Sequence, residues 1–411
     1  TERYHALVMN PPYMGGGNMN AVLSNYVKKN YEAGKADLFS VFMQVAEERL
    51  AENGKYGMIN MQSWMFLSSF EKLRTHLLET LQIDSMLHLG PRTFDELSGE
   101  VVQNTAFVVT RHTPYTTGTY FRLVDGKSCG DKERMFLAGE NGYPHVSQQN
   151  FEKIPGCPIG YWVSERMIEA FGFPKLSSIG EPRSGIMTGN NQRFIRLVHE
   201  VSPQQIGFSL KVSNDILVSR RKWFPIATGG SARKWYGNLD TIVNMYNNGE
   251  EIRENVTNYR LREPKFYFRE SITWPKICSG FTTCRLCPEG VLFGDSGLNL
   301  FIDTNLKYYL GLLNSKVSLY IMKVINPTFN NQVSDVGNIP VKSINSKEQI
   351  EFLVSQNISI SKQDWDAHET SWDFQENEIV RLSKEQGEGS HRLSDLMDAY
   401  REHWTEQFRQ L

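Results

Sequence analysis

A short stretch near the start of the chain combines an amide, two prolines and an aromatic ring: Asn10-Pro11-Pro12-Tyr13. It follows the apolar run 6–9, which is typical of a buried parallel strand. Two prolines cannot continue the hydrogen-bonded ladder of a sheet, so the strand is predicted to end at Asn10. The tetrapeptide is therefore expected at the carboxyl edge of a sheet, where open α/β sheets bind ligands.

This combination of groups suits one step in nucleic-acid chemistry. An exocyclic amine on a nucleobase is a poor nucleophile because its lone pair is conjugated into the ring. The Asn10 side-chain oxygen and the Pro11 carbonyl are rigidly held acceptors that can take the two N–H groups of such an amine and free its lone pair for attack. Tyr13 offers a face on which a flipped-out base can stack. The alternative interpretation is an ordinary turn that ends a strand.

The segments that follow the turn occur in a defined order along the chain. They are Lys35-Ala36-Asp37-Leu38-Phe39, the turn and strand at 52–60, Leu87-His88-Leu89-Gly90, Phe94, and the strand 105–109. Together with Asn10-Pro11-Pro12-Tyr13, this order resembles the gamma-class methyltransferases that modify adenine N6 in DNA. The resemblance covers residues 1 to about 112, whereas the residues alone do not distinguish adenine N6 from cytosine N4.

The resemblance implies roles for particular residues. Asn10, Pro11, Pro12 and Tyr13 would form the catalytic turn, and Phe94 would pack on the flipped base from the other side, although a loop phenylalanine is more often a lid or core residue. Asp37 and Phe39, at the start of a helix predicted over 37–50, would border the site of the methyl donor, S-adenosyl-L-methionine. Asp37 is also a suitable N-cap for that helix.

Strands and helices alternate through the first part of the chain. A strand is predicted at 56–62, a helix near 70–78, and a pair of strands at 83–89 and 105–110 that form an antiparallel edge. Alternation of this kind indicates βαβ units and a parallel sheet. Residues 112–160, rich in Gly, Pro, Thr and Tyr, are interpreted as a linker and the start of a second domain.

The sequence offers no donor-binding glycine loop before the catalytic turn. In this fold such a loop follows the first strand, and only nine residues precede Asn10. Gly15-Gly16-Gly17 comes after the turn and is interpreted as a mobile lid. The expected α/β fold is thus the C-terminal half of a Rossmann-like methyltransferase sheet in residues 1–115. We expect the chain alone to bind S-adenosyl-L-methionine weakly or not at all.

Residues 116–345 are predicted to form a mixed α+β target-recognition domain. The stretch 185–194 resembles the opening of target-recognition domains in type I and type IIG restriction systems. Its candidate DNA contacts are Thr188, Asn190, Asn191 and Arg193, because amides and guanidinium groups can read base edges. The alternative is a polar loop without a ligand.

A basic and aromatic region follows that stretch. Residues 211–285 hold 13 Lys and Arg against 7 Asp and Glu, a net charge of +6. Its candidate DNA contacts are Arg220, Arg221, Lys222, Arg233 and Lys234, since cations suit phosphates and guanine edges. A run of charge is more often a solvated face, and the clustering within one domain is what favours DNA.

Residues 346–411 are predicted to be a helical C-terminal segment with a net charge of −7. Apolar residues at three- and four-residue steps, from Leu393 to Leu411, indicate a helix that docks on another domain or partner. The segment 363–374, with the catalytic turn and the recognition domain, resembles the PglX methyltransferases of BREX phage-defence systems. That resemblance implies double-stranded DNA and other BREX proteins as partners. The alternatives are the methyltransferase part of a type IIG restriction enzyme and a non-catalytic DNA-specificity module.

Composition narrows the remaining possibilities. No apolar run approaches the roughly 18–20 residues of a membrane span, and no signal segment opens the chain. The five cysteines form no dense framework, which suits a reducing cytoplasm. Cys284 and Cys287 form a single C-x-x-C without a second pair, so buried thiols are favoured over a metal site.

Overall fold

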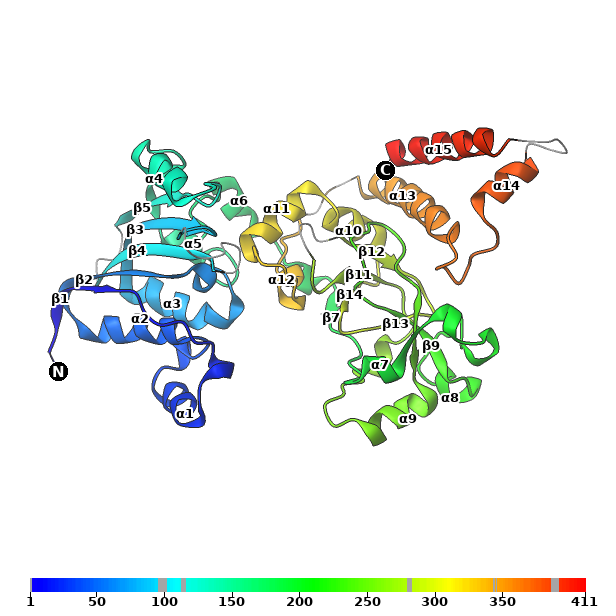
Figure 1. Ribbon diagram of the computed structural model, residues 1–411, viewed down its shortest axis with the longest axis horizontal. Helices are drawn as coiled ribbons and strands as arrows, with labels where there is room; N and C mark the ends of the chain where they lie inside the picture. Colours follow the sequence, from blue (N-terminus) through cyan, green and yellow to red (C-terminus); the bar gives the residue numbers. More distant parts are fainter. Residues whose placement is uncertain are drawn as a thin grey trace. The chain divides into compact units, whose positions relative to one another are not determined.

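The computed structural model describes residues 2–94, 102–111, 116–278, 283–342, 344, 346–385 and 392–411. The chain divides into two compact units (Figure 1). Unit 1 comprises Thr1–Phe173 with Lys323–Thr328, and unit 2 comprises Pro174–Met322 with Phe329–Leu411.

Unit 1 is built on a six-stranded sheet with the strand order β1-β2-β4-β3-β5-β6. The strands are β1 (Tyr4–Met9), β2 (Leu50–Met61), β3 (Leu81–Gly90), β4 (Asn104–Arg111), β5 (Thr117–Arg122) and β6 (Gly142–Ser147). β1 pairs with β2 in parallel, and β3 pairs with β5 in parallel, whereas β4 runs antiparallel to both β2 and β3. The carboxyl ends of β1, β2, β3 and β5 therefore meet at one edge, together with the start of β4.

The helices of unit 1 follow the apolar periodicity of the sequence. They are α1 (Ala21–Asn30), α2 (Leu38–Arg49), α3 (Glu71–Thr80), α4 (Cys129–Leu137), α5 (Gln149–Glu152) and α6 (Glu165–Ala170). α2 begins after Asp37, whose side chain caps it as predicted. α2 and α3 bury Phe39, Met43, Leu73 and Leu77 in a core shared with the sheet.

The first unit extends beyond the predicted boundary. Residue 115 itself lies outside the described residues, but β5 and β6 on its far side continue the sheet past β3. Tyr120 of β5, Phe151 of α5 and Tyr161 are buried in the same core as α2 and α3. The stretch 112–160 is therefore not simply a linker, because its buried aromatic rings complete the hydrophobic core of unit 1.

Two details of the predicted sheet were wrong. β3 and β4 are antiparallel as expected, but they do not form an edge, since β2 and β5 flank them. β1 is parallel to β2 as expected, but it is not buried, and Val8 is 89% exposed. Within the described residues β1 pairs only with β2, which leaves its other edge and much of its surface uncovered.

Unit 2 contains two four-stranded sheets. One has the order β13-β9-β10-β8, with β8 (Ile195–Leu197), β9 (Trp223–Ala227), β10 (Thr241–Asn244) and β13 (Leu292–Phe293). The other has the order β12-β11-β14-β7, with β7 (Glu181–Arg183), β11 (Ser271–Pro275), β12 (Arg285–Cys287) and β14 (Gly297–Phe301). A mixed α+β architecture was predicted for this region, and these sheets and helices are consistent with it.

Short helices surround these sheets, and longer ones form the end of the chain. They are α7 (Asn191–Phe194), α8 (Asp215–Ser219), α9 (Tyr246–Asn255), α10 (Leu306–Leu313), α11 (Lys316–Ile325), α12 (Val333–Gly337), α13 (Lys347–Asp366), α14 (Glu378–Glu385) and α15 (Leu393–Gln410). α13 packs against α10, and α15 packs against α14 (Figure 1). The predicted helical tail is thus present, although Leu393 and Phe408 of its apolar stripe are exposed.

The cysteine pair at the start and end of the segment 284–287, which includes β12, lies in the interior of unit 2. Cys284 and Cys287 are buried free thiols, and burial raises the pKa of Cys284 to about 12 and that of Cys287 to about 11. Both groups therefore remain protonated at neutral pH and act as small packing groups. Among the described helices, none is both long and apolar enough to cross a bilayer.

The extended core of unit 1 can be tested with one substitution. Phe151 is buried against Tyr120, with ring centroids 5.9 Å apart, so Phe151→Ala should cost about 3–5 kcal/mol of unit 1 stability. Hydrogen exchange of the β3 amides should accelerate accordingly. The control is Leu137→Ala at an exposed position of α4, expected to change stability by less than about 0.5 kcal/mol. Equal β3 protection in both variants would place α5 outside the core.

Candidate functional site

The predicted catalytic turn lies at the carboxyl edge of the unit 1 sheet. Asn10 follows β1 directly and is exposed, while Pro11 behind it is buried. Asp37 fixes the far end of the turn, because its Oδ1 accepts from the Met14 amide at 3.0 Å and from the Phe39 amide at 3.2 Å. The Met14 carbonyl in turn accepts from the Leu38 amide at 3.0 Å. One carboxylate therefore caps α2 and holds the turn against its N-terminus.

Tyr13 is supported from two sides. Its ring meets the ring of Phe39 edge to face at a centroid distance of 6.1 Å, and Phe39 packs on Phe70 at 5.5 Å. Its hydroxyl accepts a hydrogen bond of 3.1 Å from Asn104 Nδ2, at the start of β4. Burial raises the pKa of Tyr13, so the phenol is protonated at neutral pH. The 39% of Tyr13 that remains exposed can meet a planar ligand.

A layer of buried and half-buried polar side chains lies along the same sheet edge. Asn104 Nδ2 also donates to the Asn60 carbonyl at 3.4 Å, and Asn60 Oδ1 accepts from Trp64 Nε1 at 3.0 Å. His88 bridges Gln62 Oε1 at 2.8 Å and the Tyr161 hydroxyl at 3.0 Å. Burial lowers the pKa of His88 to about 3, which keeps its ring neutral.

The sequence interpretation did not single out Asn104, Gln62 or His88 for this layer. Their signal was present in the sequence, because each is a polar residue at or next to the end of an otherwise apolar strand. Such residues need hydrogen-bond partners when buried, and partners are available only where strand ends converge. The missing information was the strand order, which brings Asn104 of β4 beside the catalytic turn.

The other predicted site residues of unit 1 lie in three different environments. Phe94 follows β3, so it lies on the same sheet edge as the turn, and it is 41% exposed. Asp37 Oδ1 is already engaged by two backbone amides. Phe39 is 0% exposed, and its ring packs against the ring of Tyr13. It therefore has a packing role and offers no surface that a ligand can reach.

The recognition stretch in unit 2 is a tightly bonded turn. Thr188 is buried, and its Oγ1 donates to Asn191 Oδ1 at 2.6 Å and accepts from the Asn190 amide at 3.2 Å. Asn190 Oδ1 caps α7 by accepting from the Arg193 amide at 3.1 Å. Burial rules out direct base contact by Thr188, and the side-chain oxygens of Asn190 and Asn191 already accept hydrogen bonds. Arg193 remains exposed, with its guanidinium over the Phe194 ring at 5.3 Å.

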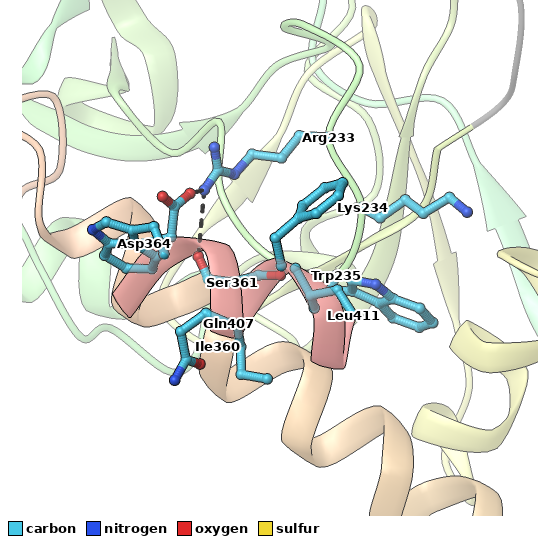
Figure 2. A pocket seen from close by; sticks show the side chains of 10 residues that line it. Arg233, Lys234, Trp235, Ile360, Ser361, Asp364, Gln407 and Leu411 are labelled. Atoms are coloured by element: carbon cyan, nitrogen blue, oxygen red, sulfur yellow. Dashed lines mark hydrogen bonds and ion pairs between the residues drawn. The ribbon is translucent and has the colours of Figure 1, made fainter. Parts of the chain in front are cut away.

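Two cations of the basic region have partners inside unit 2, and one of them, Arg233, holds the helical tail. Figure 2 shows Arg233 directed at α13, where it pairs with Asp364 and donates to the Ser361 carbonyl. Its guanidinium also lies over the Trp365 ring at 5.2 Å. Lys234 Nζ donates to the Asn314 carbonyl at 3.4 Å. The internal partners of Arg233 favour a structural role for it, whereas DNA contact by Lys234 stays a prediction.

The remaining three cations lie together on another face of unit 2. Arg220 and Arg221 are exposed between α8 and β9. Lys222, the next residue, pairs with Glu251 at 2.7 Å. These residues line a pocket of about 530 Å³ with Gln204, Gln205, Ser219 and Tyr246. Within the described part of the chain, Arg220 and Arg221 form no ion pair that neutralises their charge.

Comparison with known proteins gives a family match for unit 1. Residues 1–94 match the family model described as Eco57I restriction-modification methylase. Two curated proteins are similar over 92% of this chain. The adenine-specific methyltransferase PglX of Lacticaseibacillus casei (strain Zhang) is 40% identical over 397 residues. The adenine-specific methyltransferase BrxX of Escherichia coli O9:H4 (strain HS) is 41% identical over 386 residues.

These matches confirm the resemblance to PglX methyltransferases that the sequence indicates. The chain covers 33% of the length of the first relative and 31% of the second, so it spans about one third of each. The aligned region includes most of both units, because it takes in 92% of this chain.

Solved structures share the fold at much lower identity. The type IIL restriction-modification enzyme MmeI, determined in complex with DNA, has a TM-score of 0.57 at 11% identity, covering 98% of this chain and 57% of that one. A nuclease-deletion mutant of the type ISP enzyme LlaGI, bound to a DNA substrate mimic, has a TM-score of 0.50 at 12% identity, covering 87% of this chain and 41% of that one. At these identities the likeness concerns the fold alone.

The double role of Asp37 leads to a measurable expectation. Asp37→Ala should remove both the α2 cap and the hold on Met14, at a cost of about 1 kcal/mol. Amide exchange at Met14 and Phe39 should then accelerate together. The control is Asn20→Ala, which removes the cap of α1 at Leu23 and should leave the Met14 amide protected. Unchanged exchange at Met14 in Asp37→Ala would show that other contacts hold the turn.

Proposed function

We propose that this chain is the catalytic-turn and DNA-recognition part of an adenine-specific DNA methyltransferase of the PglX type. Its reaction would be methyl transfer from S-adenosyl-L-methionine to adenine N6 in a short DNA site, in BREX phage defence. The observation that carries the proposal is the rigid Asn10–Tyr13 turn at the carboxyl edge of the unit 1 sheet. The similarity to two adenine-specific methyltransferases over 92% of the chain supports it.

In this mechanism the turn binds and orients the target amine. The Asn10 side-chain oxygen and the Pro11 carbonyl accept the two N6–H groups, which favours the lone pair over its conjugation with the ring. Tyr13, fixed by Phe39 and Asn104, stacks on the base after it leaves the duplex. Phe94, on the same sheet edge, is proposed to contact the opposite face of the base. Preorganisation matters because acceptors already in place need no rearrangement as charge develops.

The methyl donor is assigned by family similarity, and its contacts are not assigned to this chain. S-adenosyl-L-methionine would supply the methyl group. Asp37 and Phe39 were the candidate donor contacts, yet the Asp37 oxygen is occupied by two amides and Phe39 is fully buried. Asp37 and Phe39 therefore fit a role in supporting the turn better than a role in binding the donor, and only the supporting role is proposed for them.

DNA is the proposed partner of unit 2, through the exposed cations Arg193, Arg220 and Arg221. Other BREX proteins are proposed partners of the whole methyltransferase, on the strength of the PglX and BrxX relatives. The second candidate function is the methyltransferase part of a restriction enzyme, favoured by the Eco57I match over 1–94. A non-catalytic specificity module is less well supported, because Asn10 and Tyr13 are both present and suitably exposed.

Substitution of the turn tests the catalytic proposal. In the full-length methyltransferase, Asn10→Ala should lower kcat for adenine methylation by about 10²-fold or more while leaving DNA affinity nearly unchanged. The reason is that the lost acceptor acts mainly in the transition state. Asn18→Ala, an exposed asparagine in the same loop, is the matched control and should methylate normally. Substantial methylation by Asn10→Ala would sink the assignment.

Salt dependence tests the DNA surface. Replacing Arg220 and Arg221 together with Gln should weaken DNA binding and reduce the slope of log K against log salt by about 1.8, or about 0.9 for each lost phosphate contact. Lys222→Gln is the control, with a smaller change, because Glu251 already neutralises Lys222. The measurement is fluorescence anisotropy of labelled duplex DNA across a salt series. An unchanged slope in the double variant would move the DNA to another surface.

A further inference from the structure

A polar pocket in unit 2 combines cations, amides and an aromatic ring. Its volume is about 530 Å³, and it is lined by Gln204, Gln205, Ser219, Arg220, Arg221, Lys222, Tyr246 and Glu251. These residues come from three places: the short 3-10 turn Pro203–Gln205, the junction of α8 with β9, and the first two turns of α9. Figure 1 shows α8 and α9 as neighbouring helices beside β9, and they pack against one another.

One side of the pocket is fixed by buried or paired groups. Glu251 Oε1 accepts from Lys222 Nζ at 2.7 Å, and its Oε2 accepts from Asn244 Nδ2 at 3.1 Å. The ion pair with Lys222 lowers the pKa of Glu251, so the pair is charged at neutral pH. The Gln205 carbonyl accepts from the Lys222 amide at 3.2 Å, and the Met245 amide donates to the Lys222 carbonyl at 3.1 Å. This side is therefore rigid and electrically balanced.

The rim of the pocket is exposed and carries unbalanced positive charge. Arg220 and Arg221 project from the α8–β9 junction, and Gln204 and Gln205 are exposed across from Ser219. Within the described residues, neither guanidinium has a carboxylate partner. The rim thus offers cations for phosphates, next to amides that can donate and accept at once.

A turn with unusual backbone geometry adjoins this rim. Asn247, Asn248 and Gly249 have φ angles of 47°, 58° and 82°, three successive left-handed residues. Asparagine tolerates this conformation better than most residues, and Gly249 packs so closely that a Cβ there would approach Leu261 Cδ1 to 2.9 Å. The turn leaves Asn247 exposed and Asn248 half-buried, next to Tyr246 of the pocket. Conformations of this cost are typical of functional sites.

We propose that this pocket rim and the 247–248 turn form a base-reading surface for A·T base pairs in the major groove of DNA. Arg220 and Arg221 hold the backbone phosphates, which sets the register of the duplex. The amides of Asn248 and Gln205 read adenine, because an amide can accept from N6 and donate to N7 simultaneously. The inference rests on the proposed DNA methyltransferase function and concerns bases outside the flipped target.

The choice of Asn248 and Gln205 follows from their remaining hydrogen-bonding capacity. The Asn247 amide already donates to Glu250 Oε2 at 2.9 Å, whereas within the described residues no hydrogen bond engages the side chain of Asn248 or Gln205. The structural bond of Gln205 uses its backbone carbonyl, so its side chain is available. Both amides can therefore meet a ligand without breaking an internal contact.

The experiment uses the full-length methyltransferase with Asn248→Gly or Gln205→Ala. Glycine adopts a positive φ freely, so Asn248→Gly removes the amide and keeps the turn. Gln205→Ala lies on a different element and provides a second, independent variant. The control is Asn141→Gly, an exposed asparagine with a φ of 53° in unit 1, where the same chemical change should have no effect on sequence preference. Two readouts are taken: sequences selected from a random duplex pool by binding, and the motif methylated in plasmid DNA.

The expected result is roughly a tenfold loss of discrimination at one or two A·T positions in both readouts, with other positions unchanged. A uniform fall in affinity at every sequence would overturn base reading and leave only phosphate contact. An unaltered motif in both variants would also overturn the inference. If the wild-type protein selects a DNA sequence but methylates none, the proposed function fails while the selection readout still decides this inference.

Discussion

The candidate catalytic edge depends on one carboxylate. Asp37 accepts from the Met14 amide, at the end of the Asn10–Tyr13 turn, and from the Phe39 amide, at the start of α2. The Asp37 carboxylate thus links the turn to α2. Because α2 packs in the core, the turn is held rigidly against the core. Phe39 extends the same connection to the Tyr13 ring. Prolines alone restrict the local backbone, but they do not fix the turn relative to the sheet.

What the sequence could predict was largely local. Short-range signals predict the strand before Asn10, the N-cap at Asp37, and the helices α2 and α3. The structure confirms each of these elements. The limits appear where a residue's role depends on a distant partner. Arg233 resembles a DNA contact in the sequence, but in the fold it pairs with Asp364, which lies 131 residues further along the chain. Thr188 resembled a reading residue, but the turn around it folds inward and buries it.

Pairing, more than the number of cations, determines the electrostatic surface of unit 2. A net charge of +6 over residues 211–285 suggested a broad basic face. Lys222 and Arg233 are each neutralised by a carboxylate, whereas Arg220 and Arg221 are not. Paired cations attract phosphates weakly because their field is cancelled at short range, and salt screens what remains. The effective positive surface is therefore smaller than the net charge of the sequence indicates, and it includes Arg220 and Arg221 of the pocket beside α9.

The two polar surfaces differ in how their side chains relate to the core. At the unit 1 edge, Asn104 donates a hydrogen bond to the Tyr13 hydroxyl, and the Tyr13 ring packs on the core residue Phe39. Substitution there therefore disturbs the packing that supports the site as well as the site itself. In the 247–248 turn the backbone geometry is held by Gly249 against Leu261, and the exposed Asn247 and half-buried Asn248 are not part of that packing contact. Side chains at 247 and 248 can therefore change while the fold persists, provided that the new residue accepts a positive φ. A surface of this kind can vary in sequence preference while the catalytic edge of unit 1 stays the same.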